Sequence, residues 1–212
     1  MHTMEQRAYT LLVSLFVGGL VIAAVVSCKI VNVFGMSVPA GVLAYSITFA
    51  VSDIISEVWG KKRAQELVLC GFAALGTSIL LSSLALTWPA APFWNGQESF
   101  ALVFGVTPRI VAASLIAYAI SQNHDVWLFH FLRKRSNGKH LWVRNNVSTI
   151  ISQLLDSVIF VTVAFYGELP VLPVILGQWT VKVAIALLDT PVVYAGVGIL
   201  RGHILGKPEP AV

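Results

Sequence analysis

The sequence predicts an all-α membrane protein, a bundle of six transmembrane helices with both termini in the cytoplasm. The first observation behind this fold class is composition: 57% of the 212 residues are hydrophobic and 11% are charged. Soluble domains carry about 45–50% apolar and about 25% charged residues. The second observation is a series of apolar runs that are long enough to cross a bilayer. The third is that basic residues gather in alternate connections between these runs.

The apolar runs set the predicted elements, because a spanning helix needs about 20 mostly apolar residues. We expect helices over about residues 9–28, 38–58, 66–86, 109–132, 147–166 and 171–200. Pro39 fits the first turn of the second helix. The sixth run is long enough to be tilted or broken. We treat residues 1–212 as a single integral membrane domain.

The charges in the connections predict the orientation. Basic residues separate the second helix from the third and the fourth from the fifth, and they flank both ends of the bundle: Arg7, Lys61, Lys62, Arg63, Arg133, Lys134, Arg135, Lys139, Arg144, Arg201 and Lys207. The positive-inside rule places these segments in the cytoplasm of a multi-pass protein of the inner membrane. The same distribution explains the net charge of +4 without a nucleic-acid partner, so the lipid bilayer is the expected surrounding.

Polar side chains inside the predicted spans are the candidate functional residues. A charged residue at the centre of a span costs about 2.5–3.5 kcal/mol on insertion scales and usually faces a cavity or a partner. The candidate substrate-binding residues are Asp53, Gln122, Asp125, Asn145, Asn146, Gln153, Asp156, Lys182 and Asp189. In the predicted orientation they lie between the midplane and the cytoplasmic face, so we expect them to converge on one cavity.

The fifth predicted helix carries the strongest pattern. Asn146, Thr149, Gln153 and Asp156 recur at i, i+3, i+7 and i+10, which places them on one face over three turns. Hydrogen bonds between helices, at about 0.6–2 kcal/mol each, explain amides and hydroxyls in such a position. They do not call for a carboxylate, so the stripe indicates a polar binding surface.

The sixth predicted helix combines charge with a helix breaker. Lys182 and Asp189 lie two turns apart on one face, and Pro191 leaves the carbonyl of Leu187 without its backbone donor. Charged residues beside a broken helix commonly line a polar site. The alternative is a Lys182–Asp189 pair, or a pair between helices, that only holds the bundle together.

The chemistry of these residues predicts the class of ligand. A carboxylate can accept hydrogen bonds from the paired N–H groups of a guanine-type edge, while amides bond the ligand carbonyl. Trp127, Phe129, Trp142 and Phe160 are candidates for stacking on a planar ring. The excess of acidic residues also suits a cationic amine, so the residues alone leave the compound open.

Taken together, these residues resemble the queuosine precursor transporter family, also called the vitamin uptake transporter (VUT) family. The matching stretches are Ser52–Glu57 with Gly60–Lys62, Gln122–Asp125 with Phe129, Leu141–Asn146, Ser148-Thr149, Ser152-Gln153, Asp156-Ser157, Lys182 and Leu188–Pro191. The resemblance implies import of 7-cyano- and/or 7-aminomethyl-7-deazaguanine. It also implies a fold similar in outline to the substrate-binding components of energy-coupling vitamin transporters.

Three functions follow from these observations. The first is a secondary transporter that alternates access around the candidate residues. The second is a substrate-binding subunit, since the chain lacks a Walker A motif; an energising partner or a second copy could dock on small residues at 18–19 or 71–76. The third is an intramembrane enzyme using His124 with Asp125, or His130 with His140. No HExxH motif occurs, so we expect neither an enzyme nor a cofactor.

Overall fold

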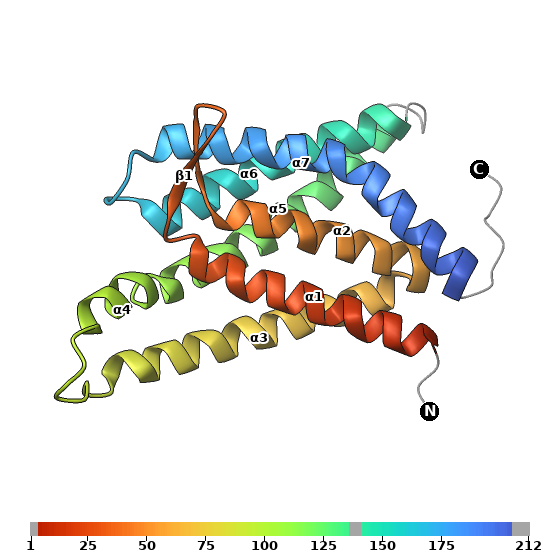
Figure 1. The fold of residues 1–212 in the computed structure, drawn as a ribbon. Coiled ribbons are helices and arrows are strands. Elements are labelled where there is room, and N and C mark those ends of the chain that lie inside the picture. The colour runs from red at the N-terminus through yellow and green to blue at the C-terminus, as the bar shows by residue number, and fades with distance from the viewer. Residues whose placement is uncertain (1–3, 136–140, 205–212) are drawn as a thin grey trace.

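The structure, a computed structural model, describes residues 4–135 and 141–204. The chain folds into helices that pack along one another, with one small hairpin laid across them (Figure 1). The elements are α1 Met4–Val26, β1 Ile30–Val33, β2 Met36–Pro39, α2 Gly41–Trp59, α3 Lys61–Thr87, α4 Gln97–Phe104, α5 Thr107–Arg135, α6 Leu141–Phe165, α7 Val171–Ile199 and the π-helix η1 Leu200–Ile204. The prediction of an all-α membrane fold is confirmed in its helical character.

Within the described residues, five helical stretches are long and apolar enough to cross a membrane. They are Met4–Val26, Gly41–Trp59, Lys62–Thr87, Gln97–Ser121 and Val171–Leu188. The described apolar stretch of α6 is shorter, Thr149–Phe165. These helices make the chain a multi-pass membrane protein, while the sixth span and the position of the termini stay predictions.

The helices form two groups that pack against each other. In the first group α5, α6 and α7 pack together, and in the second α1, α2 and α3 do so, with α2 against α7 and α3 against α5 joining the groups. The core of the first group is Ile110, Ala113, Ala117, Phe160, Val161, Ala164, Phe165, Val174 and Ile175. The core of the second group is Phe16, Leu20, Ala24, Val51, Ile55, Leu67, Leu75 and Val111.

An antiparallel hairpin joins α1 to α2, and it corrects the predicted start of the second helix. Val38 and Pro39 lie in β2, so Pro39 is not in a first helical turn and α2 begins at Gly41. The strands pair from Ile30 with Pro39 to Val33 with Met36. Pairing with β1 satisfies backbone groups that the predicted helix would have had to satisfy within itself.

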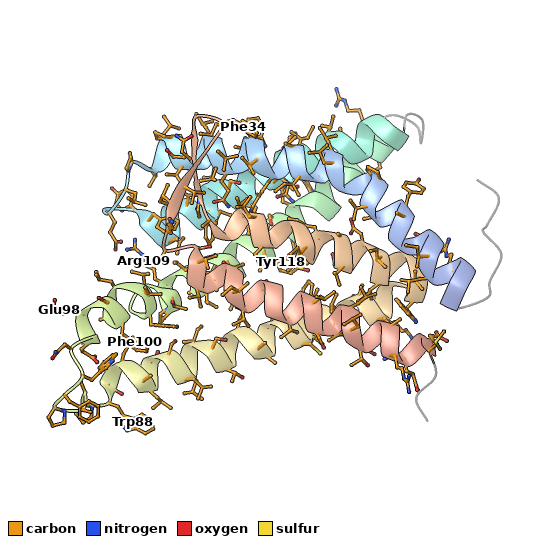
Figure 2. All side chains as sticks on the ribbon, in the orientation of Figure 1. Phe34, Trp88, Glu98, Phe100, Arg109 and Tyr118 are labelled. Carbon is orange, nitrogen blue, oxygen red and sulfur yellow. The ribbon has the colours of Figure 1, made fainter. Side chains whose placement is uncertain are left out.

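The turn of the hairpin explains why the chain reverses there. Phe34 has φ 50° and Gly35 has φ 84°, the pair of positive values that a two-residue type I′ turn requires. The Gly35 amide donates to Asn32 Oδ1 at 2.8 Å. Phe34 is almost fully exposed at the tip, which Figure 2 shows projecting beyond the helices.

The hairpin packs closely on α7. A Cβ atom at Gly177 would lie 2.3 Å from the carbonyl oxygen of Ser37, so the absence of a side chain there permits the contact. Val38 of β2 packs with Val42 of α2 and Val181 of α7. The hairpin therefore fixes α7 against α2 near one end of the bundle.

Connections alternate between the two ends of the bundle. The start of α1, the α2–α3 turn and the end of α7 share one end, and the hairpin and the α6–α7 connection share the other (Figure 1). Gly60, with φ 84°, allows α3 to begin at Lys61, earlier than the predicted residue 66. At the far end of α7, the helix continues through Pro191 to Ile199 and its ribbon bends (Figure 1).

The proline-rich connection after α3 forms a separate aromatic feature. Trp88 and Phe93 are largely exposed, and α4 follows them with Phe100 packed 6.2 Å from Trp94 between ring centroids. An open pocket of about 340 Å³ lies here, lined by residues 85–100. Figure 2 shows Trp88 and Phe100 at the outer end of α3.

At the same end of the bundle, Arg109 ties the start of α5 to the end of α6 (labelled in Figure 2). Its guanidinium donates to the carbonyl oxygens of Val163 and Tyr166, each at 2.8 Å. A third bond, also 2.8 Å, reaches Glu168 Oε1. The fork thus satisfies carbonyls that the α6 C-terminus leaves without helical partners.

Some of the small residues proposed as a docking surface are used for packing between helices inside the bundle. A Cβ at Gly71 would lie 2.7 Å from Leu20 and 2.8 Å from Phe16, so α3 uses this glycine to approach α1. Gly18 and Gly76 have nothing within 4 Å of such an atom. The predicted docking surface is therefore divided between internal packing and open faces.

Candidate substrate-binding site

One face of α7 changes from apolar to polar along its length. Val174, Gln178 and Lys182 recur at i, i+4 and i+8 and are 2%, 3% and 5% exposed. Val174 belongs to the apolar core shared with α5 and α6. The next two turns of the same buried face carry an amide and an ammonium group.

The ammonium group of Lys182 meets a carboxylate from α6. Its Nζ pairs with Asp156 Oδ2, and the side chains are 5% and 18% exposed. The other carboxylate oxygen accepts from Ser121 Oγ of α5 at 3.3 Å. Three helices therefore place polar groups at one point, which lies directly beyond their shared apolar core.

A second contact between α5 and α6 lies one turn from this pair. His124 Nδ1 and Ser152 Oγ are 3.2 Å apart, and Ser152 is 5% exposed. These contacts form a continuous polar seam, which consists of Ser121 and His124 on α5, Ser152 and Asp156 on α6, and Lys182 on α7. Of the stripe predicted on α6, Asp156 takes part in these contacts.

Two amide oxygens on the helices of this pair have no partner among the described residues. Gln153 Oε1 on α6 and Gln178 Oε1 on α7 are buried and accept no hydrogen bond within the described part of the chain. Leaving a buried acceptor unsatisfied costs about 1–3 kcal/mol. Two donors on the same helices bond backbone carbonyls instead: Ser157 Oγ donates to the Gln153 carbonyl at 2.9 Å and Trp179 Nε1 to the Ile150 carbonyl at 3.1 Å.

The predicted site residues divide into three groups. Gln153, Asp156 and Lys182 come together at the interface of α6 and α7. Asp53 lies on α2 and is exposed. The remaining side chains lie outside the described residues, although their backbone positions fall in α5, α6 and α7: Gln122, Asp125, Asn145, Asn146 and Asp189.

Two of the four aromatic candidates for stacking, Phe160 and Trp127, have described side chains. Phe160 is 6% exposed within the apolar core and its ring packs on Phe165 with centroids 5.9 Å apart. Trp127 is 60% exposed and stacks on Phe131. Phe129 and Trp142 lie outside the side chains that the structure describes.

Four polar residues of this cluster were not among the predicted substrate-binding residues: Ser121, His124, Ser152 and Gln178. Ser121 is an isolated hydroxyl whose role depends on the register of α5 against α6, which spacing within one helix does not give. Gln178 lies four residues before Lys182, so the two share a face. That spacing was a usable signal.

The sequence left open an ion pair that only holds the bundle together, either Lys182 with Asp189 or a pair between helices. The described pair is of the second kind. Lys182 of α7 pairs with Asp156 of α6, while the side chain of Asp189 lies outside the described residues. Breaking a buried pair strongly destabilises a protein, yet replacing both partners is often neutral. A pair that binds substrate and a pair that holds helices together are therefore separable by experiment.

The described residues hold no group of three His, Cys, Asp or Glu side chains that could bind a metal ion. The polar groups present are an ammonium, a carboxylate, two amides, an imidazole and hydroxyls. Such groups can donate hydrogen bonds to a neutral or weakly charged heterocycle and accept them from it. They make this cluster the candidate substrate-binding site.

Comparison with known families decides the class of protein. The family model described as "Putative vitamin uptake transporter" matches residues 39–196. The chain belongs to the vitamin uptake transporter family. The match runs from β2 to α7, so it includes every element that forms the polar seam. The predicted family membership is confirmed.

Curated relatives carry names that agree with this family. The chain is 32% identical to a probable queuosine precursor transporter of Bacillus subtilis over 171 residues, 79% of this chain and 75% of the relative. It is 25% identical to the queuosine precursor transporter of Escherichia coli, over 64% of this chain and 59% of the relative. A probable queuosine precursor transporter of Haemophilus influenzae is also 25% identical, over 64% and 55%.

These matches fix the function at a coarse level. The vitamin uptake transporter family and its relatives are transporters of small molecules, so this member is a membrane transporter and not an enzyme. This confirms the predicted absence of enzymatic function. No solved structure matches the chain.

Proposed function

We propose that the protein imports a queuosine precursor, 7-cyano- and/or 7-aminomethyl-7-deazaguanine, across the inner membrane. The printed names of the relatives support this substrate. The observation that carries the proposal is the buried polar seam of α5, α6 and α7, centred on Asp156 and Lys182. Both termini are proposed to lie in the cytoplasm.

The hydrogen-bonding groups of the seam complement such a substrate. A deazaguanine presents N–H donors on its ring and exocyclic amine, and a carbonyl acceptor beside them. The Asp156 carboxylate and the Gln153 amide oxygen accept from N–H groups, and the Lys182 ammonium donates to a carbonyl. Charge-assisted bonds of this kind are roughly twice as strong as neutral ones.

Transport requires that the site open to one side at a time. In the described conformation Lys182 and Asp156 satisfy each other, so the substrate must replace part of this pair when it binds. The exchange keeps both charges compensated, which limits the cost of separating them in a low-dielectric interior. Pro191 lies inside α7, and a proline inside a helix is a common cause of a kink about which the helix end can move.

Cells that cannot synthesise 7-deazaguanines provide the test. Such cells, also lacking their own transporter, are given 7-cyano-7-deazaguanine and the queuosine content of their tRNA is measured by mass spectrometry. We expect the wild-type protein to restore queuosine and Asp156→Asn to abolish it. The exposed α7 variant Thr180→Val is the matched control and should behave as wild type. Absence of queuosine despite wild-type protein in the membrane would refute the proposal.

A further inference from the structure

The side-chain oxygen of Gln178 on α7 is a buried acceptor without a partner among the described residues. The residue is 3% exposed, and its Oε1 accepts no hydrogen bond within the described residues. It lies between the apolar core residue Val174 and the charged Lys182 on one face of α7. An amide in this position gives up its hydration without a replacement in the fold.

A second unpartnered oxygen approaches from the neighbouring helix. Gln153 precedes Asp156 by three residues on α6, and its Oε1 is likewise buried without a partner in the described chain. By helical spacing, Gln153 lies one turn from Asp156 on α6 and Gln178 lies one turn from Lys182 on α7. Both are acceptors, so this part of the site is matched to a ligand that presents several N–H donors.

Within the described residues, the donors of known partner bond other acceptors than these two amide oxygens. The hydroxyl of Ser157 donates to the Gln153 carbonyl, the indole of Trp179 to the Ile150 carbonyl, and the hydroxyl of Ser121 to Asp156. An acceptor kept in the protein interior while neighbouring donors are engaged is consistent with a partner that arrives with the ligand.

We propose that Gln178 determines specificity: its Oε1 accepts an N–H of the exocyclic amine on the guanine-type edge of the substrate, beside the acceptors of Gln153 and Asp156. This inference rests on the proposed function and adds to it a residue and a selection rule. Heterocycles that carry the amine bind, and those that lack it leave the amide oxygen unsatisfied. Sites built around such bonds discriminate strongly against analogues that cannot form them.

The test measures binding of two ligands to the purified protein in lipid nanodiscs by calorimetry. One ligand is 7-cyano-7-deazaguanine, and the other is the same molecule without its 2-amino group. We expect the wild-type protein to prefer the amine-bearing ligand by about tenfold or more, the value of one buried hydrogen bond. Gln178→Met should weaken binding of that ligand by about the same factor and leave the other unchanged, so the preference disappears.

Thermal unfolding of the same variants separates binding from folding. Replacing an unsatisfied buried amide by an apolar side chain of similar length should leave the melting temperature of Gln178→Met equal to or above that of the wild type. Thr180→Val, whose hydroxyl bonds the Leu176 carbonyl on an exposed part of α7, should keep the ligand preference. This control detects non-specific effects of substitution on the helix.

The possible outcomes are distinct. A wild-type protein that binds neither ligand refutes the proposed function. A wild-type protein that binds, together with a Gln178→Met variant that keeps the preference for the amine, overturns the specificity inference alone. A lowered melting temperature with equal weakening of both ligands would show that Gln178 has a structural role, and would also overturn it.

Discussion

Lys182 of α7 and Asp156 of α6 form an ion pair inside the bundle, with side chains 5% and 18% exposed. The pair lies where the apolar core of α5, α6 and α7 gives way to polar residues. A charged pair in this position is costly to form and gives little net stability. We propose that the pair serves substrate binding, and the alternative is that it only holds the helices together.

A double-mutant cycle tests this distinction. Asp156→Asn or Lys182→Met alone leaves one buried charge without its partner, so each should lower the free energy of unfolding by about 3–5 kcal/mol. The double variant removes both charges and should recover most of that stability. Chemical or thermal unfolding in detergent measures all four proteins. A double variant as unstable as the single variants would show that the pair itself holds the helices.

The contact between the hairpin and α7 predicts a second effect. Gly177→Ala would place a Cβ atom 2.3 Å from the Ser37 carbonyl oxygen, so the hairpin must move away. We expect a loss of about 1–3 kcal/mol, typical of an overpacked contact. Gly198→Ala is the matched control on the same helix, because nothing lies within 4 Å of the added atom. Equal melting temperatures for the two variants would contradict the close approach.

Arg109 predicts an order among three variants. Its ion pair with Glu168 is exposed at 38% and 54%, and such pairs contribute about 0–1 kcal/mol. Its bonds to the Val163 and Tyr166 carbonyls matter more, so Glu168→Gln should destabilise least. Lysine keeps the charge but loses the planar fork, and Arg109→Met loses all three bonds. The melting temperature should therefore be lowest for Arg109→Met, intermediate for Arg109→Lys and highest for Glu168→Gln. If Glu168→Gln were the most harmful, the ion pair would be the main contribution.

The predicted orientation is tested by cysteine labelling. In a background with Cys28→Ser and Cys70→Ser, single cysteines replace Phe34 at the hairpin tip and Lys134 near the end of α5. An impermeant thiol reagent should label the Phe34→Cys protein in intact cells and the Lys134→Cys protein only in inverted vesicles, because the basic end faces the cytoplasm. Labelling of both residues from the same side would contradict the six-span topology.

Hydrophobic runs predicted the helices because each run has the length that the bilayer requires. The hairpin was missed because periodicity alone does not distinguish its short apolar strands from the ends of the neighbouring helices. Its best signal was the Asn32 to Gly35 segment, where an Asx contact and a glycine support a tight turn. The short helix α4 was missed for the same reason, since eight residues give little periodicity.

The candidate site could be predicted where polar or charged residues interrupt apolar helices. Gln153, Asp156 and Lys182 stand out in apolar helices, and the structure brings them together. The partners of Asp156 were not predictable from spacing alone, because they depend on how α5 and α7 are turned and shifted against α6. Gln178 is an example. Its spacing of four residues from Lys182 is visible in the sequence, but the burial of its oxygen without a partner is visible only in the structure.

The most direct test is uptake of labelled 7-cyano-7-deazaguanine into proteoliposomes that contain only this protein, with and without an imposed proton gradient. We predict saturable uptake by the wild type and by Thr180→Val, and its loss in Asp156→Asn, with a dependence on the gradient revealing the energy source. Wild-type liposomes that bind the compound without taking it up would contradict a self-sufficient transporter. Wild-type liposomes that neither bind nor take it up would contradict the proposed substrate.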